Sequence, residues 1–282
     1  MTWWVSSGNG RGDEHAITIK AMPLTDTFLN TLVAELDNDD VVGIMLGGSY
    51  VRGEATPYSD VDLACFVKDE AKLQPKRFLY RDNLLVSIGT KTVAGIRNDL
   101  LKPESAILIV SGLRRILLDK DGTVTRLVQE IEAFTWEPLQ NTANSYASFR
   151  MMTLAERVHK VLSELLKRDE LALAYVTSEL VYALTEVVAV QRGVLIKSES
   201  TYYLQVQAAA GQHSDWTGCH RWAVGVDSVS TQGSLVLTQA IAALRLYQET
   251  VKLLRPVLLQ DHLAVAEQAT RMIDEAFPYL GL

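Results

Sequence analysis

The chain carries, at residues 41–68, the sequence VVGIMLGGSYVRGEATPYSDVDLACFVK. Its first six residues are a short apolar run that predicts a strand, and the run ends at Gly47-Gly48, where positive φ is available without a Cβ penalty. Ser49 follows directly and can cap the next helical turn, so that nearby backbone N–H groups point outward in a geometry that cradles a phosphate. The stretch therefore predicts a strand, a glycine turn, a short helical turn and a second strand in succession, and the rest of the chain is organised around it.

The second half of this stretch carries a pair of aspartates. A strand is predicted at 60–67, and its alternation of side chains places Asp60 and Asp62 on one face, about 7 Å apart along the strand. Two such carboxylates either face water at a strand end or hold a cation between them. Mg²⁺ is usually bound by one or two carboxylates together with substrate phosphates. Because a Gly-Gly-Ser turn precedes the pair, we favour a metal–triphosphate site over the solvent-facing alternative.

Three motifs follow one another in order, namely Gly47-Gly48-Ser49, Arg52-Gly53 and Ser59-Asp60-Val61-Asp62-Leu63. Together they resemble the signature of the polymerase-beta-type nucleotidyltransferase superfamily, in the branch with the aminoglycoside, lincosamide and minimal nucleotidyltransferases. The resemblance implies that Asp60 and Asp62 bind Mg²⁺ and act in catalysis, with an NTP, ATP being the expected one, as co-substrate. It implies a nucleotide-binding set made of Gly47, Gly48, Ser49, Arg52 and Ser59. Arg52 would neutralise phosphate charge or, alternatively, brace the turn by pairing with Glu54 or Asp60.

One element of the family pattern is missing. Many members supply a third carboxylate from a following strand, and the best candidate strand is 84–88, where the aligned position is Ser87. A hydroxyl does not replace that charge. Either the general base comes from elsewhere, as from a glutamate of the helical domain in some antibiotic-modifying members, or the site binds nucleotide without turning it over.

The predicted fold class is an α+β (mixed α/β) N-terminal nucleotidyltransferase domain, residues 23–137, followed by a C-terminal α-helical bundle, residues 138–282, that binds the acceptor. Residues 1–22 are predicted to be an N-terminal arm, because neither a strand nor a periodic helix flanks their glycines. Thr25 is the expected N-cap of a helix at 26–36. Further elements predicted in the N-terminal domain are strands at 77–80, 84–88, 106–111 and 116–118, and helices at 92–101 and from the 119–122 turn to 134.

Helical periodicity runs from residue 141 to the C-terminus with one break at 211–233. Within the predicted helix at 171–192, Tyr175, Glu179, Tyr182 and Glu186 share one face. Glutamates in such an apolar helix must face something polar, because an unpaired buried carboxylate is costly. They either pair with Arg157, His159 or Lys160, or line the cleft, where Glu179 or Glu186 would deprotonate an acceptor hydroxyl as the catalytic base.

The break at 211–233 concentrates aromatic and metal-binding residue types. His213, Cys219 and His220, with Asp215, suggest zinc, but their spacing matches no standard zinc pattern. We prefer an aromatic wall over the acceptor, with Trp216 and Trp222 in it.

Composition limits the classes of function. The net charge of −7 argues against general nucleic-acid binding. No signal pattern or membrane-length apolar run is recognised in the sequence, and two cysteines favour a reducing cytoplasm. The leading hypothesis is Mg²⁺-dependent transfer of an NMP to a hydroxyl of an aminoglycoside-like small molecule, cationic because of the acidic stripe, with a homodimer left open. The alternatives are a nucleotide-binding regulatory or antitoxin-like protein without turnover, and a plain scaffold.

Overall fold

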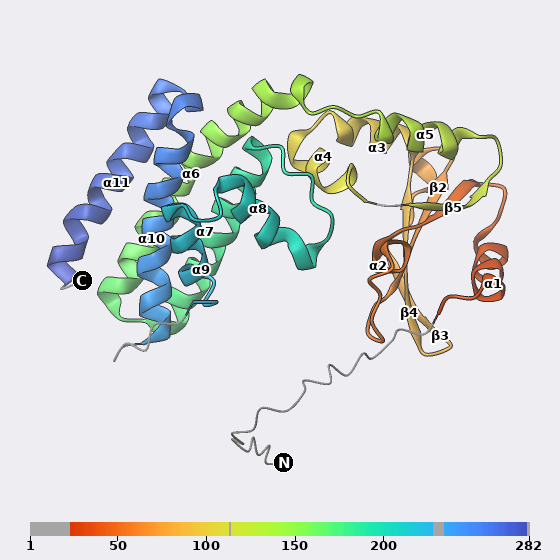
Figure 1. Ribbon diagram of the computed structural model, residues 1–282, viewed down its shortest axis with the longest axis horizontal. Coiled ribbons are helices and arrows are strands. Elements are labelled where there is room, and N and C mark those ends of the chain that lie inside the picture. Colours follow the sequence, from red (N-terminus) through yellow and green to blue (C-terminus); the bar gives the residue numbers. More distant parts are fainter. Residues whose placement is uncertain (1–22, 113, 228–233, 281–282) are drawn as a thin grey trace, which may run out of the picture.

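The computed structural model describes residues 23–112, 114–227 and 234–280 (Figure 1). The arm predicted at 1–22 lies outside the described residues. A mixed α/β domain and a mostly helical domain lie side by side, as the fold-class prediction requires. The chain crosses between them after residue 132, close to the predicted boundary.

The N-terminal domain is built on one five-stranded sheet with the order β3-β4-β2-β1-β5. β2 and β4 are parallel, and the other neighbouring pairs are antiparallel. The predicted strands at 41–46, 60–67, 77–80, 84–88 and 116–118 are confirmed. The bounds are β1 Val41–Leu46, β2 Val61–Val67, β3 Arg77–Arg81, β4 Leu84–Lys91 and β5 Arg115–Asp119.

Helix α1 (Asp26–Leu36) covers one face of this sheet. The Thr25 hydroxyl accepts a hydrogen bond from the Phe28 N–H at 3.1 Å, so the helix begins at the predicted cap. Leu29 and Leu32 are buried against the inward side chains of β1, β2 and β4. In Figure 1, α1 lies on the side of the sheet that faces away from the helical domain.

The opposite face of the sheet is covered at only one end. α3 (Val93–Leu100) and α5 (Thr123–Glu132) pack there around Met45 and Phe66. Both helices were expected from the sequence. The remainder of this face, with the connection α2 (Gly48–Arg52) at the end of β1, is turned toward the helical domain (Figure 1).

The strand predicted at 106–111 is wrong, because these residues form helix α4 (Pro103–Ile109). A short apolar run does not distinguish a strand from a buried helix, whereas a proline at the first helical position favours a helix. Ile107 packs into the core of the helical domain, and its carbonyl accepts a hydrogen bond from the Ile196 N–H at 2.7 Å. α4 therefore ties the two domains together.

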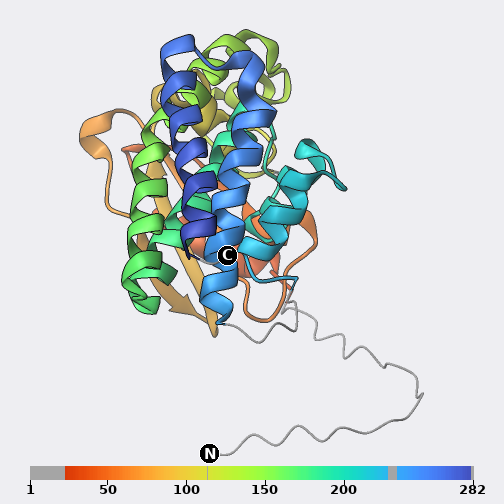
Figure 2. The same ribbon diagram turned by 90° about the vertical axis from the view of Figure 1, so that its left-hand side faces the viewer.

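The helical domain is centred on four long helices, whose bounds are α6 Gln140–Lys167, α7 Glu170–Gln191, α10 Leu235–Leu254 and α11 Gln260–Leu280. Figure 2 shows α6, α10 and α11 side by side. α7 is long and apolar enough to cross a membrane, but 67% of its most apolar window is buried within the domain. That burial is typical of the core helix of a bundle.

The break predicted at 211–233 is only partly correct. Residues Asp215–Ala223 form helix α9, which packs with α8 (Tyr202–Ala210) beside α7 and α10. Ser214 caps α9 by accepting a hydrogen bond from the Thr217 N–H. The capping serine and the burial of Trp216 and His220, four residues apart, explain why a helix forms here.

Trp216 and His220 are core residues. The Trp216 indole donates to the Thr250 hydroxyl at 2.9 Å, and His220 lies between the side chains of Thr185 and Gln207 at 3.0 and 2.9 Å. Burial lowers the pKa of His220 to about 4, so the imidazole is neutral. The aromatic-wall prediction is therefore wrong for Trp216, and His220 serves the packing of α9 on α7.

Candidate active site

The glycine turn sits directly against the aspartate pair. The Gly47 N–H donates to the backbone carbonyl of Asp62 at 2.9 Å, which joins the turn to the start of β2. Gly48 adopts a φ of +73°, and a Cβ at this position would collide with the Asp62 carboxylate. Glycine is required here for both reasons, because L-residues rarely adopt this conformation and no side chain fits.

Asp60 lies close enough to Asp62 for its negative charge to act on the Asp62 carboxylate. Asp62 is half-buried, and its pKa is raised first by burial and second by the negative charge of Asp60. Lys76, a hydrogen bond from Ser87 and Arg52 act in the opposite direction. Two neighbouring carboxylates, one of them partly desolvated, repel each other, and a bound cation would reduce this repulsion.

The donor set fits a divalent ion held partly by substrate. Among the described residues, no group of three or more His, Cys, Asp or Glu side chains is placed to hold a metal. Two carboxylates beside a glycine turn suit Mg²⁺, which takes few protein ligands and completes its coordination with water and phosphate oxygens. The side chains that would hold the ion are those of Asp60 and Asp62.

A cavity of about 590 Å³ opens beside Asp62. The glycine turn, Asp62 and Ser87 form one end of it, and α3, α4 and α5 contribute apolar residues to the other. Three cationic side chains line it as well, those of Lys76, Lys91 and Arg114. Its volume lies within the range of small-molecule sites.

The three cations were not found by sequence reasoning. Within the described part of the chain, none of the three forms an ion pair with a carboxylate. Partial loss of hydration lowers the pKa of both Lys91 and Arg114, although Lys91 keeps part of its surface in contact with solvent. Three cationic side chains without a direct carboxylate partner around a cavity attract an anion, and a triphosphate is of this class.

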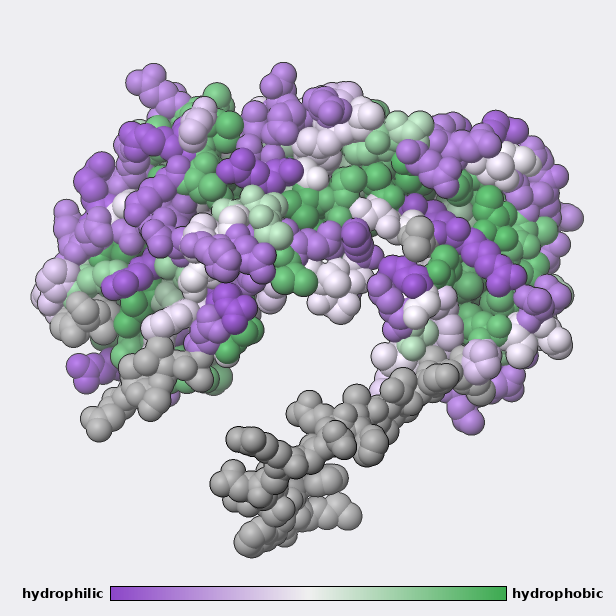
Figure 3. All heavy atoms as spheres, in the orientation of Figure 1, coloured by the Kyte–Doolittle hydropathy of each residue, from purple (hydrophilic) through white to green (hydrophobic). Residues whose placement is uncertain are grey.

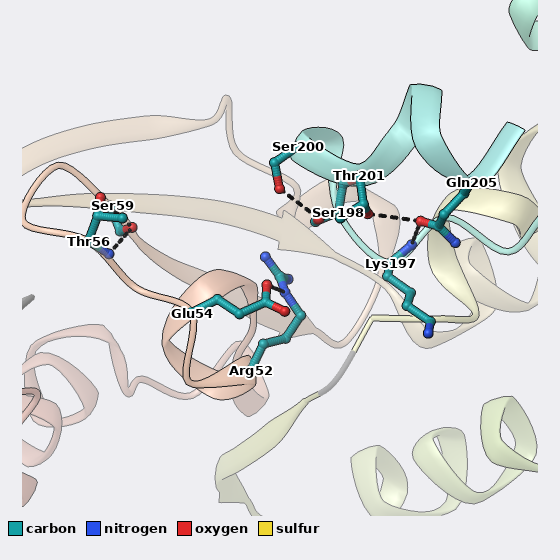
Figure 4. A network of polar contacts seen from close by, with 9 residues as sticks. All are labelled: Arg52, Glu54, Thr56, Ser59, Lys197, Ser198, Ser200, Thr201 and Gln205. Atoms are coloured by element: carbon teal, nitrogen blue, oxygen red, sulfur yellow. Dashed lines mark hydrogen bonds and ion pairs between the residues drawn. The ribbon is translucent and has the colours of Figure 1, made fainter. Parts of the chain in front are cut away.

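Three residues of the predicted nucleotide-binding set lie outside this lining. Arg52 pairs with Glu54 at 2.8 Å, which is the bracing alternative (Figure 4). The Ser59 hydroxyl accepts a hydrogen bond from the Thr56 N–H at 2.9 Å and thereby shapes the connection into β2. Ser49, Arg52 and Ser59 do not line the cavity, whereas Gly47 and Gly48 do.

The glutamates of α7 are not brought together with Asp62. Glu179 and Glu186 line a different cavity, of about 340 Å³, between α6 and α7. Arg157 lies 3.0 Å from Glu179, so the pairing alternative is confirmed for this residue, and Arg150 lies 3.5 Å from Glu186. The Tyr175 hydroxyl also donates to Glu179 at 2.8 Å. Each of the two α7 glutamates therefore lies close to an arginine of α6.

A carboxylate of the helical domain does reach the cavity, and it is Glu199. It lies in the connection between α7 and α8, among hydrogen-bonded hydroxyl residues. The Thr201 hydroxyl donates to the Gln205 side chain at 2.9 Å, and the Ser198 and Ser200 hydroxyls are 2.9 Å apart. Figure 4 shows this segment across from Arg52 and Glu54 of the N-terminal domain. No spacing in the sequence links Glu199 to Asp62, because only the packing of the two domains brings them near.

Comparison with known proteins agrees with the glycine turn and the aspartate pair. Residues 29–121 match the family model described as a nucleotidyltransferase domain. The matched segment contains the turn, both aspartates and the sheet that carries them, which supports the superfamily for this part of the chain.

The other comparisons add little. No curated protein matches the chain. Among solved structures, a nucleotidyltransferase-like protein from Exiguobacterium sibiricum is similar, with 15% identity, coverage of 90% of each chain and a TM-score of 0.47. A likeness at this level carries no argument about function.

Proposed function

We propose that this protein transfers a nucleoside monophosphate from an NTP, with ATP as the expected donor, to a hydroxyl of a small-molecule acceptor and releases pyrophosphate. The observation that carries the proposal is Asp62, the second residue of the aspartate pair, set against the glycine turn in the lining of a cavity with three cationic side chains. Carboxylates for a metal and cations for a polyphosphate are the two requirements of phosphoryl-group transfer.

Each side chain has a defined task. Asp60 and Asp62 would hold Mg²⁺, which when bound supplies positive charge against the transferred phosphoryl group. Lys76, Lys91 and Arg114 bind the phosphate oxygens of the nucleotide. Gly48 lets the polyphosphate approach the backbone, and Ser87 orients the Asp62 carboxylate by hydrogen bonding.

Glu199 replaces the α7 glutamates as our candidate general base. It is the helical-domain carboxylate in the cavity lining, whereas Glu179 and Glu186 are held by arginines elsewhere. In the proposed step, Glu199 accepts the proton of the acceptor hydroxyl, the hydroxyl oxygen forms a bond to the α-phosphorus, and the bond to the pyrophosphate oxygen breaks.

A second candidate function is nucleotide binding without turnover, as in a regulatory or antitoxin-like protein. Ser87 favours it, because this residue stands on β4 directly opposite Asp62 and is buried at 2% exposure. A neutral hydroxyl at this position leaves the aspartate pair without a third carboxylate.

Thermal-shift titration with Mg²⁺ and each NTP tests nucleotide binding, because a ligand that binds the native state raises its stability. We expect a Mg²⁺-dependent shift in the wild type that is lost in Asp62→Asn. Asp39→Asn is the matched control, since Asp39 is exposed in the loop before β1. Release of pyrophosphate with pooled hydroxyl compounds then separates the two candidates. A shift without release favours the binding protein, and no shift with any nucleotide contradicts both.

A further inference from the structure

Two exposed aromatic side chains stand on the edge strand β3. Phe78 is 58% exposed and Tyr80 is 76% exposed, although both belong to a regular strand of the sheet. Large exposed apolar side chains grouped on one surface indicate a contact surface for a partner or ligand. The question is which face of the sheet they occupy.

The alternation of side chains along β3 shows which face Phe78 and Tyr80 occupy. Leu79 packs against the core beneath α1, and Arg81 pairs with Glu35 of α1 at 2.8 Å. Side chains alternate between the two faces of a strand, so Phe78 and Tyr80 point to the opposite face. Asp62 lies on this same face, because its neighbours Val61 and Leu63 pack on the α1 side.

The strand register aligns Phe78 with Asp62. Ser87 on β4 is paired with Asp62 on one side and with Phe78 on the other. Tyr80 is paired with Leu85, two residues before Ser87 on the same strand. One row of paired residues therefore crosses the face, Asp62–Ser87–Phe78, and Tyr80 lies beside it on β3. Neighbouring strands are about 4.8 Å apart, which puts Phe78 roughly 10 Å from Asp62.

The cavity and this aromatic pair adjoin each other on the open face of the sheet, because Ser87 lines the cavity and Lys76, which also lines it, lies over the Phe78 ring. The cavity with the cations extends from Asp62 toward Phe66 and the helices α3, α4 and α5. The aromatic pair lies across Ser87, on the part of the sheet that these helices leave open. Figure 3 shows the hollow between the two domains into which this part of the molecule opens. A molecule that approaches Asp62 from the β3 edge of the sheet passes over Phe78 and Tyr80.

We propose that Phe78 and Tyr80 form the platform for the non-reacting part of the acceptor, and that the acceptor is a neutral saccharide of at least two rings. This inference rests on the proposed transfer. The C–H faces of a sugar ring pack on the electron-rich faces of aromatic rings. A separation of roughly 10 Å spans one sugar ring at the aspartates and a second on the platform.

The charge around the platform argues for a neutral acceptor. The Lys76 ammonium lies 4.9 Å from the centroid of the Phe78 ring, and Lys91 and Arg114 line the adjoining cavity. The ammonium of Lys76 beside the Phe78 ring disfavours a cationic group on the platform itself. The α7 glutamates, which would have attracted one, are paired with arginines.

The experiment measures Mg²⁺- and ATP-dependent pyrophosphate release with maltose, sucrose, glucose, sorbitol and kanamycin. Wild type is compared with Phe78→Ala and Tyr80→Ala, and Tyr279→Ala is the control, because Tyr279 is an exposed tyrosine of α11. We expect the disaccharides to be the best acceptors. Each platform variant should lower kcat/KM for a disaccharide about tenfold, with the KM for ATP unchanged in Tyr80→Ala, which does not touch Lys76, and with the control variant unchanged throughout.

The outcomes separate the inference from the proposed function. Disaccharide transfer that is equal in wild type and both platform variants overturns the platform. Preference for kanamycin or sorbitol overturns the neutral, two-ring acceptor while leaving the transferase in place. Wild-type protein that binds Mg²⁺-ATP and releases no pyrophosphate with any of the five compounds contradicts the proposed transfer, and the inference falls with it.

Discussion

Asp62 of β2 and Ser87 of β4 are paired residues of two parallel strands, and the hydrogen bond from the Ser87 side chain counteracts the rise of the Asp62 pKa that burial causes. Ser87 is the residue expected from the sequence resemblance at the position of a third carboxylate, and its hydroxyl supports one of the two aspartates. This relationship makes the carboxylate pair, rather than a carboxylate triad, the centre of the site.

Ser87→Ala should destabilise the metal-free protein by about 1 kcal/mol at pH 7, because Asp62 loses a hydrogen bond in a partly desolvated place. The folded-state pKa of Asp62 lies above its ordinary value of 3.8, so the stability associated with this group is fully present below that value and is lost as the pH rises through the raised pKa. Removal of the serine hydroxyl enlarges that loss. Urea unfolding at pH 3.5 and 7 should show that Ser87→Ala lowers the free energy of unfolding, relative to wild type, more at pH 7 than at pH 3.5.

The same comparison in an Asp62→Asn background provides the control. In that background the loss of unfolding free energy caused by Ser87→Ala should no longer depend on pH, since the Asp62 carboxyl that titrates has been removed. A deficit of equal size at both pH values in the wild-type background would contradict the coupling between the two residues.

Gly48→Ala should abolish the Mg²⁺-nucleotide thermal shift. The new Cβ meets the Asp62 carboxylate, and the φ of +73° adds backbone strain of about 1–2 kcal/mol. Gly53→Ala is the matched control, because Gly53 has nearly the same φ, +72°, with no heavy atom near the added Cβ. Both variants should lose stability through backbone strain, Gly48→Ala more because of the added clash, and only Gly48→Ala should lose nucleotide binding. Equal nucleotide binding by the two variants would remove Gly48 from the site.

Glu199→Gln should lower kcat for transfer about 100-fold or more and leave the nucleotide-induced thermal shift intact, because a general base acts on the acceptor and not on nucleotide binding. Glu179→Gln is the comparison, since Glu179 lines the separate cavity with Arg157. It should change stability and leave kcat near the wild-type value. The reverse result, a large loss of kcat in Glu179→Gln alone, would return the base to α7.

Acidification should destabilise the helical domain through His220. Its folded pKa of about 4 lies below the ordinary 6.5, so the unfolded chain takes up the proton first and stability is lost as the pH falls from 6.5 toward 4. The loss between pH 7.5 and pH 5 is roughly 2 kcal/mol from this residue. Urea unfolding of wild type and His220→Gln measures it as the difference in slope with pH. His213→Gln should keep the wild-type slope, and identical slopes in all three proteins would contradict the assignment.

Elements with a local cause were predictable. Thr25 caps α1 through a side chain three residues from its partner, and the glycine turn before β2 depends on residues adjacent in the chain. The error at 106–111 has the opposite cause. The burial of Ile107 in the helical domain is a long-range contact, and an apolar run alone does not reveal which core will cover it.

The residues of the candidate site also fall into two groups, those placed together by local sequence spacing and those brought together by long-range contacts. Gly47, Gly48, Asp60 and Asp62 belong to the turn after β1 and to the start of β2 with the residue before it, where sequence spacing already places side chains together. Lys91, Arg114 and Glu199 come from β4, the segment before β5 and the connection after α7, and no spacing relates them to the aspartates.

By itself, the sequence determined the strand–turn–strand unit, its aspartate pair and the helical character of the second half, because turn chemistry and side-chain periodicity act over a few residues. Only the tertiary structure decided which charges surround the cavity beside Asp62, that the α7 glutamates face arginines, and that Phe78 stands in register with Asp62. Strand pairing and domain packing bring together residues far apart in the chain, and the contacts that decide both are not encoded in any one segment.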